Sequence, residues 1–173
     1  MADSLESLGR GKWLELVREG RWEFVRRTNV SGVVAMIPIT DKNEVVLVEQ
    51  FRTALKRPCI EIPAGLVGDE KAGEDPLAAA KRELEEETGF EGSSWTYLFE
   101  GAASGGLTTE TIRFYLVRGL ERVGPGGGDD SEDIKVHVVP LAGLHEWLQS
   151  KAREGFAVDA KVYIAPWAAS QGS

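Results

Sequence analysis

GLVGDEKAGEDPLAAAKRELEEETGF, residues 65–90, combines signals for both ends of a helix with a dense set of carboxylates. Its second half predicts a short helix, because Asp75 can cap the start and Pro76 suits the first helical position. Gly89 suits a left-handed stop at the other end. Because both ends are defined, the faces of this helix can be assigned from the sequence.

At 100° per residue, the helix separates an apolar side from a carboxylate side. The apolar side consists of Leu77, Ala80, Leu84 and Thr88. The carboxylate side consists of Glu83, Glu86 and Glu87. Glu83 and Glu87 are an i,i+4 like-charge pair, which costs an isolated helix a few tenths of a kcal/mol, so a cation is expected beside them. Mg²⁺ takes oxygen ligands and keeps several waters, so these carboxylates suit a magnesium site. The competing interpretation is a solvated acidic face.

The spacing of the stretch resembles the Nudix box, GX5EX7REUXEEXGU, in which U is a bulky aliphatic or aromatic residue. The matching positions are Gly68, Glu74, Arg82, Glu83, Leu84, Glu86, Glu87, Gly89 and Phe90. The preceding segment 61–66, EIPAGL, resembles the family's E-[IF]-P-A-G-[LI] segment, whose glycine is usually the first glycine of the box. On that interpretation Gly65, and not Gly68, is the structural equivalent.

The resemblance implies an α+β protein with the Nudix fold, an α/β/α sandwich of mixed sheet with flanking helices, preceded by an N-terminal β-hairpin. It implies Mg²⁺-dependent hydrolysis, with Mn²⁺ as a possible substitute, of a nucleoside diphosphate linked to another moiety. The metal ligands that it implies are the Ala64 carbonyl, Glu83, Glu86, Glu87 and Glu132. Arg82 precedes Glu86 by four residues, so it is expected to orient Glu86 through a charge-assisted hydrogen bond.

Residues 11–28, GKWLELVREGRWEFVRRT, alternate apolar and charged side chains and predict a small antiparallel hairpin that turns near residues 19–20. Trp13 and Trp22 could simply pack in a core or interface. Their surroundings, however, resemble a region of ADP-sugar pyrophosphatases in which two tryptophans sandwich the base across a homodimer. Residues 1–30 are therefore expected to form a dimer, and residues 31–173 the catalytic core of a single domain.

Two β-branched runs, residues 32–39 and 44–50, flank the turn residues 41–43 and predict a central hairpin. Arg52 follows this hairpin in a Q-F-R sequence that resembles a family signature. It is either a surface arginine or a contact to the phosphate or the rest of the substrate.

Strands are also predicted at 95–100 and 111–117, on either side of the connection GAASGGLTTE. A loop of this length between paired strands often forms a wall of the substrate site, which makes Leu107 a candidate substrate contact. Gly105 stands where ADP-ribose pyrophosphatases usually have a proline. GDP-mannose or broad nucleotide-sugar hydrolysis therefore stays open beside ADP-ribose or ADP-sugar hydrolysis.

The acidic, glycine-rich segment 124–133 is expected to be a mobile loop. Its end and the following strand resemble the E-D-I-x-V segment of ADP-sugar pyrophosphatases, in which an acidic loop closes over the metals. Asp130 and Glu132 are the candidate base and late metal ligand. Beyond it, a helix is predicted over 140–154 and a last short helix over 159–165, ending near Pro166.

Composition limits the possible partners and location of the protein. At 173 residues with 42% hydrophobic side chains, one domain can bury a sizeable core. The net charge of −8 disfavours binding to nucleic acid or to an anionic membrane surface. The start has no apolar leader and no run is long enough to cross a membrane, so a cytoplasmic protein is expected. The alternative to an enzyme is a Nudix-like nucleotide sensor, which would usually have lost a box carboxylate.

Overall fold

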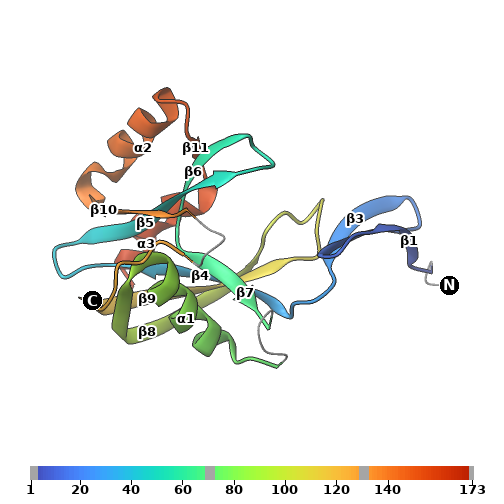
Figure 1. Ribbon diagram of the computed structural model, residues 1–173, viewed down its shortest axis with the longest axis horizontal. Coiled ribbons are helices and arrows are strands. Elements are labelled where there is room, and N and C mark those ends of the chain that lie inside the picture. Colours follow the sequence, from blue (N-terminus) through green and yellow to red (C-terminus); the bar gives the residue numbers. More distant parts are fainter. Residues whose placement is uncertain (1–3, 69–72, 129–132, 172–173) are drawn as a thin grey trace.

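The computed structural model describes residues 4–68, 73–128 and 133–171 (Figure 1). The strands are β1 (Glu6–Arg10), β2 (Leu14–Glu19), β3 (Trp22–Arg27), β4 (Gly32–Pro38), β5 (Glu44–Arg52), β6 (Arg57–Glu61), β7 (Ala64–Val67), β8 (Phe90–Ala102), β9 (Thr111–Arg122), β10 (Lys135–Pro140) and β11 (Ala157–Val158). The helices are α1 (Pro76–Thr88), α2 (Leu144–Arg153) and α3 (Ala165–Ala169), with the 3₁₀ helices η1 (Leu141–Gly143) and η2 (Ala160–Ile164).

Within the described residues, the strands form three sheets. The N-terminal sheet has the order β1-β2-β3 and is antiparallel. The second sheet has the order β7-β4-β9-β8 and is mixed, because β4 and β9 run parallel. The third has the order β10-β5-β6-β11, with β6 and β11 parallel. Mixed sheets with few helices confirm the predicted α+β class.

Helix α1 forms as its sequence predicts. The Asp75 side chain accepts a hydrogen bond from the Ala78 N–H at 3.0 Å, and Pro76 opens the first turn. Gly89 ends the helix with φ +70°, and its N–H donates to the Glu85 carbonyl. The predicted caps are therefore all confirmed.

The core has two parts, one on each face of the β4–β9 pair. On one face α1 packs through Ala80 and Leu84 against Val34 and Met36. The opposite face packs against β5, β6 and the C-terminal helices in a larger cluster. In Figure 1, α1 and α2 accordingly lie on opposite sides of the two central sheets. This layering places the carboxylate side of α1 at the edge of β7.

Both strands of the predicted central hairpin exist, but the prediction that they pair with each other is wrong. β4 pairs with β7 and β9, whereas β5 pairs with β6 and β10. A single bridge, Ile39 to Val45, joins the two runs. Both runs are buried on both faces, so each obtains partners on two sides, and the turn carries the chain from one sheet to the other.

The N-terminal hairpin is confirmed as β2 and β3, and β1 adds a third strand. This sheet projects away from the two central sheets (Figure 1). It is attached through β3, whose Val25 N–H donates to the Leu107 carbonyl at 2.8 Å and whose Val25 carbonyl accepts from the Thr109 N–H at 3.2 Å. Arg27 also forms an ion pair with Glu110. The loop between β8 and β9 therefore determines where the projecting sheet lies.

The predicted helix over 140–154 is present as α2, but the predicted last helix over 159–165 differs from the structure. Asp159 caps the 3₁₀ helix η2, and Pro166 then lies in the first turn of α3 instead of ending a helix. Proline is tolerated there because a first-turn N–H has no partner within the helix. Among the described residues, no helix has the length and hydrophobicity that crossing a membrane requires.

Candidate active site

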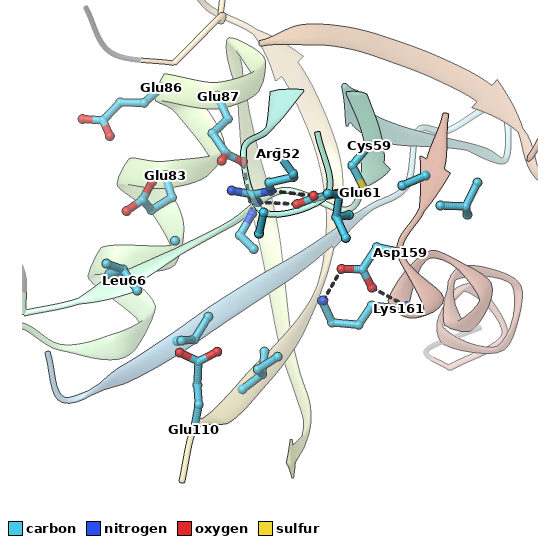
Figure 2. A pocket seen from close by; sticks show the side chains of 18 of the residues that line it. Arg52, Cys59, Glu61, Leu66, Glu83, Glu86, Glu87, Glu110, Asp159 and Lys161 are labelled. Atoms are coloured by element: carbon cyan, nitrogen blue, oxygen red, sulfur yellow. Dashed lines mark hydrogen bonds and ion pairs between the residues drawn. The ribbon is translucent and has the colours of Figure 1, made fainter. Parts of the chain in front are cut away.

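A cleft of about 650 Å³ opens beside α1 (Figure 2). Its walls come from β7 and α1, from the β5–β6 hairpin, from the end of β3 and from the β11–η2 connection. The basic lining residues are Arg27, Arg52, Arg82 and Lys161. The acidic ones are Glu61, Glu83, Glu86, Glu87, Glu110 and Asp159. Four basic and six acidic side chains leave the described lining two units negative.

Gly65 lies directly against the Glu83 side chain. A Cβ atom at this position would overlap the Glu83 carboxyl group, so any side chain here would displace Glu83 from its present position. Gly68 lies beyond β7 and donates its N–H to Glu74 at 3.3 Å. The structure thus supports Gly65 as the functional counterpart of the first box glycine, as the preceding EIPAGL segment suggests.

Arg82 lies among three carboxylates. Its guanidinium is 3.4 Å from Glu74, 3.1 Å from Glu83 and 3.1 Å from Glu86. One cation among three anions offsets the like-charge repulsion along the helix and restricts the carboxylate positions. This geometry agrees with the orienting role expected for Arg82, and it extends that role to Glu83.

Glu87 is the most buried of the three glutamates on the carboxylate side of α1, with 3% of the residue exposed. Its Oε2 accepts a hydrogen bond from the Ala64 N–H at 3.0 Å, which ties the last turn of α1 to the start of β7. Ala64 and Glu87 both line the cleft. Two of the predicted metal-ligand positions are therefore in direct contact.

The donor set fits a hard divalent cation that retains water ligands. Carboxylate oxygens of Glu83, Glu86 and Glu87 face one cleft, and the missing side chain of Gly65 leaves room beside Glu83. In the part of the chain that the structure describes, no three His, Cys, Asp or Glu side chains alone would enclose an ion. Further ligands would therefore have to be waters, a backbone carbonyl or substrate. Asp130 and Glu132 lie outside the described residues.

Arg52 lies on the cleft wall and is held by a buried carboxylate. Its Nε donates to Glu61 Oε1 at 2.7 Å, and its Nη2 donates to the other oxygen of the same group. This bond to Glu61 raises the pKa of Arg52, and burial opposes the shift only in part. Figure 2 shows the guanidinium between Glu87 and Glu61, so a positive charge is fixed next to the carboxylates of α1.

Five charged lining residues were not predicted from the sequence, and one of them is Glu61, the partner of Arg52. Asp159 and Lys161 form an ion pair on the wall opposite α1, and Arg27 and Glu110 form another at the base of the projecting sheet. Asp159 reaches the cleft because β11, a strand of two residues, pairs with β6. So short a strand has no detectable periodicity. In the sequence, the pair of adjacent arginines at 26–27 was the one feature that could have indicated a role for Arg27 in the cleft.

The structure of one chain does not bring the predicted base-binding residues to this cleft. Trp13, in the turn between β1 and β2, is 56% exposed, and Trp22, the first residue of β3, is 65% exposed. Trp22 lines a separate depression of about 600 Å³ together with Gly105 and Gly106. Leu107 is 60% exposed and is absent from the described cleft lining.

Cys59 lines the cleft but carries no reactive thiolate. Burial and the neighbouring Glu61 raise the pKa of its thiol to about 12. Because the thiolate is the nucleophilic form, this raised pKa disfavours Cys59 as a nucleophile, and its side chain is buried.

Comparison with known proteins agrees with this geometry. A family model described as NUDIX domain matches residues 30–159. A methanol dehydrogenase activator of Bacillus methanolicus is 42% identical over 134 residues, which is 78% of this chain and 69% of its own length. An ADP-sugar pyrophosphatase of Mus musculus is 33% identical over 187 residues, 94% of this chain and 84% of its own.

Two further matches concern specificity and fold. A GDP-mannose pyrophosphatase of Escherichia coli O9:H4 is 33% identical over 153 residues, 83% of this chain and 76% of its own. The crystal structure of an ADP compounds hydrolase superposes with a TM-score of 0.69 and 22% identity, covering 86% of this chain and 82% of the other. At that identity the superposition shows a shared fold.

Proposed function

The chain belongs to the NUDIX domain family, and we propose that it hydrolyses the pyrophosphate bond of a nucleoside diphosphate sugar, ADP-ribose or another ADP-sugar in the first place. The products are a nucleoside monophosphate and a sugar phosphate. The observation that carries this proposal is the cleft in which Arg82 organises the α1 carboxylates opposite the fixed charge of Arg52.

Charge explains why such a cleft needs a cation for this substrate. The described lining is two units negative, and a diphosphate adds further negative charge. We propose that Glu83, Glu86, Glu87, the Ala64 carbonyl and Glu132 hold Mg²⁺, with Mn²⁺ as a substitute. A divalent ion there supplies positive charge that offsets the two phosphates and orients them.

The side chains of the protein then have separate tasks. Arg82 keeps Glu83 and Glu86 in place, and Arg52 contacts a phosphate oxygen of the substrate. A water attacks one phosphorus, the bridging P–O bond breaks, and the water proton passes to Asp130 or Glu132. The sugar phosphate leaves with the bridging oxygen.

We place the nucleobase of the substrate between two tryptophans that the two chains of a homodimer contribute together. In one chain neither Trp13 nor Trp22 lines the cleft. Both are exposed, Trp13 in the turn between β1 and β2 and Trp22 at the start of β3. A second copy could bring them to a cleft, with Leu107 on the connecting loop. The exposed apolar side chains of the N-terminal sheet also favour a covered surface. No partner in nucleic acid or membrane is proposed, and the proposed location is the cytoplasm.

Trp22→Ala should raise KM far more than it lowers kcat, because stacking on the base stabilises ground and transition states alike. Tyr97→Ala is the matched control, since Tyr97 is a similarly exposed aromatic residue, 54% exposed, outside the projecting sheet. Steady-state kinetics and sedimentation of both variants check this. A monomeric wild type with an unchanged KM in Trp22→Ala would contradict the shared base site.

Arg52→Ala should lower the free energy of unfolding by about 1–3 kcal/mol, because the buried Glu61 carboxylate loses both of its guanidinium hydrogen bonds. KM for the diphosphate should also rise. Adding Glu61→Gln removes the unpaired charge, so the double variant should recover stability but not KM. Arg57→Ala, at the position across the hairpin, is the control. If stability and KM recover together, Arg52 acts through folding and not through the substrate.

One experiment separates the proposed function from two alternatives. GDP-mannose or broad nucleotide-sugar hydrolysis has support in the relative named for GDP-mannose and in Gly105, which stands in place of a proline. A nucleotide sensor without turnover is the alternative of another class, although all box carboxylates are present. Turnover of ADP-ribose, ADP-glucose and GDP-mannose with Mg²⁺ separates the three. Tight binding without hydrolysis of any of them would contradict the proposal.

A further inference from the structure

The segment that follows β9 closes the end of α1. Gly127 donates its N–H to the Glu87 carbonyl at 3.0 Å, and Gly128 donates to the Glu86 carbonyl at 3.0 Å. These two carbonyls belong to the last turn of the helix, where no intrahelical partner exists. The backbone of two carboxylate-bearing residues is therefore held by residues about forty positions further along the chain.

The same segment is fixed at three more points. The Val123 and Gly124 N–H groups both donate to the Gly89 carbonyl, at 2.9 and 3.2 Å. On the far side, the Ile134 N–H donates to the Gly127 carbonyl at 3.2 Å. Within the loop expected to be mobile, residues 124–128 are therefore hydrogen-bonded to the end of α1, and residues 129–132 lie outside the described residues.

Glycine is required for this closure. Gly126 has φ +68°, and a Cβ atom there would lie 2.5 Å from the Thr88 carbonyl carbon. Gly127 has φ +114°, a region that residues with a side chain rarely adopt, but the nearest atom to its Cβ position is 3.8 Å away. Substitution at 126 would force the segment off the helix, whereas substitution at 127 changes only the backbone preference.

We propose that Gly127, with its neighbours Gly126 and Gly128, is a positioning residue for the hydrolysis: its turn holds the Glu86–Glu87 backbone so that their carboxylates stay in the cleft. This inference rests on the proposed function. It assigns a task to the glycine-rich sequence that a solubilising loop would not have. Arg82 and the Ala64 N–H fix the side chains of the same two glutamates, so backbone and side chains are restrained from different elements.

Gly127→Ala and Gly155→Ala form a matched pair for the test. Gly155 also has a positive φ, +95°, with no atom within 4 Å of its Cβ position, and it follows α2 away from the box helix. Both variants should lose a similar few degrees of melting temperature. Only Gly127→Ala should lower kcat, by about 10- to 100-fold, because small displacements of catalytic groups cost that much. Its half-saturating Mg²⁺ concentration should rise, while KM for the nucleotide sugar changes little.

Amide hydrogen exchange measures, independently of turnover, whether the segment after β9 stays hydrogen-bonded to the end of α1. The backbone amides at positions 127 and 128 should exchange slowly in the wild type and in Gly155→Ala, and quickly in Gly127→Ala. Fast exchange in the wild type, or equal kcat values in the two variants, would overturn the proposal. A wild type with slow exchange and no turnover of any nucleotide sugar would instead overturn the proposed function, and the inference with it.

Discussion

Conversion of Asp130 or Glu132 to its amide should lower kcat by roughly 10²–10⁴-fold, the range expected when a general base or a late metal ligand is removed. The carboxylate is expected to accept the proton of the attacking water, and an amide cannot. Both residues lie outside the described residues, so their assignment depends on the sequence resemblance. Asp130 is the better candidate for the base and Glu132 for the metal ligand.

Folding should be unaffected in these variants, because the bonds that fix the neighbouring segment are made by the backbone of residues 123–128 and 134. Asp133→Asn, which removes an exposed acid from the same segment, is the control and should retain wild-type kcat. Single-turnover rates and melting temperatures of the three variants check this. Near-normal kcat in both Asp130→Asn and Glu132→Gln would remove these acids from the mechanism.

The box helix was predictable because all of its signals are local. Asp75, Pro76 and Gly89 act within one turn of the helix end that they define, and the spacing of Leu84 and Glu87 fixes which side each occupies. The carboxylate side of the candidate site is therefore contained in one short stretch. Even there, Gly68 fits the motif by spacing, whereas the EIPAGL segment points to Gly65, and the close contact of Gly65 with Glu83 supports the second interpretation.

Sheet membership was not predictable in the same way. The β4 and β5 runs look like a hairpin because turn residues separate them, but their partners come from β9, β6 and β10. Such pairings depend on burial across the whole core, which no local pattern records. The Asp159–Lys161 wall was missed for the same reason, because long-range packing brings it to the cleft.

Glu87→Gln is expected to abolish most of the turnover while leaving the metal-free protein as stable as the wild type or slightly more stable. The amide removes one charge from the repelling set on α1. Its oxygen can still accept the Ala64 N–H hydrogen bond that Glu87 accepts now. Glu85→Gln is the matched control, because it makes the same change at an exposed position of the same helix.

The most direct test of the metal-dependent site is the melting temperature of the wild type, Glu87→Gln and Glu85→Gln in EDTA and in Mg²⁺, measured beside nucleotide-sugar hydrolysis. Binding to the native state at 100 times Kd should add about 2.7 kcal/mol to the wild type, which corresponds to roughly 5–10 °C for a chain of this size. Glu85→Gln should keep this increment and its activity, and Glu87→Gln should lose most of both. Equal Mg²⁺ shifts in all three proteins, with full activity in Glu87→Gln, would contradict Glu87 as a metal ligand.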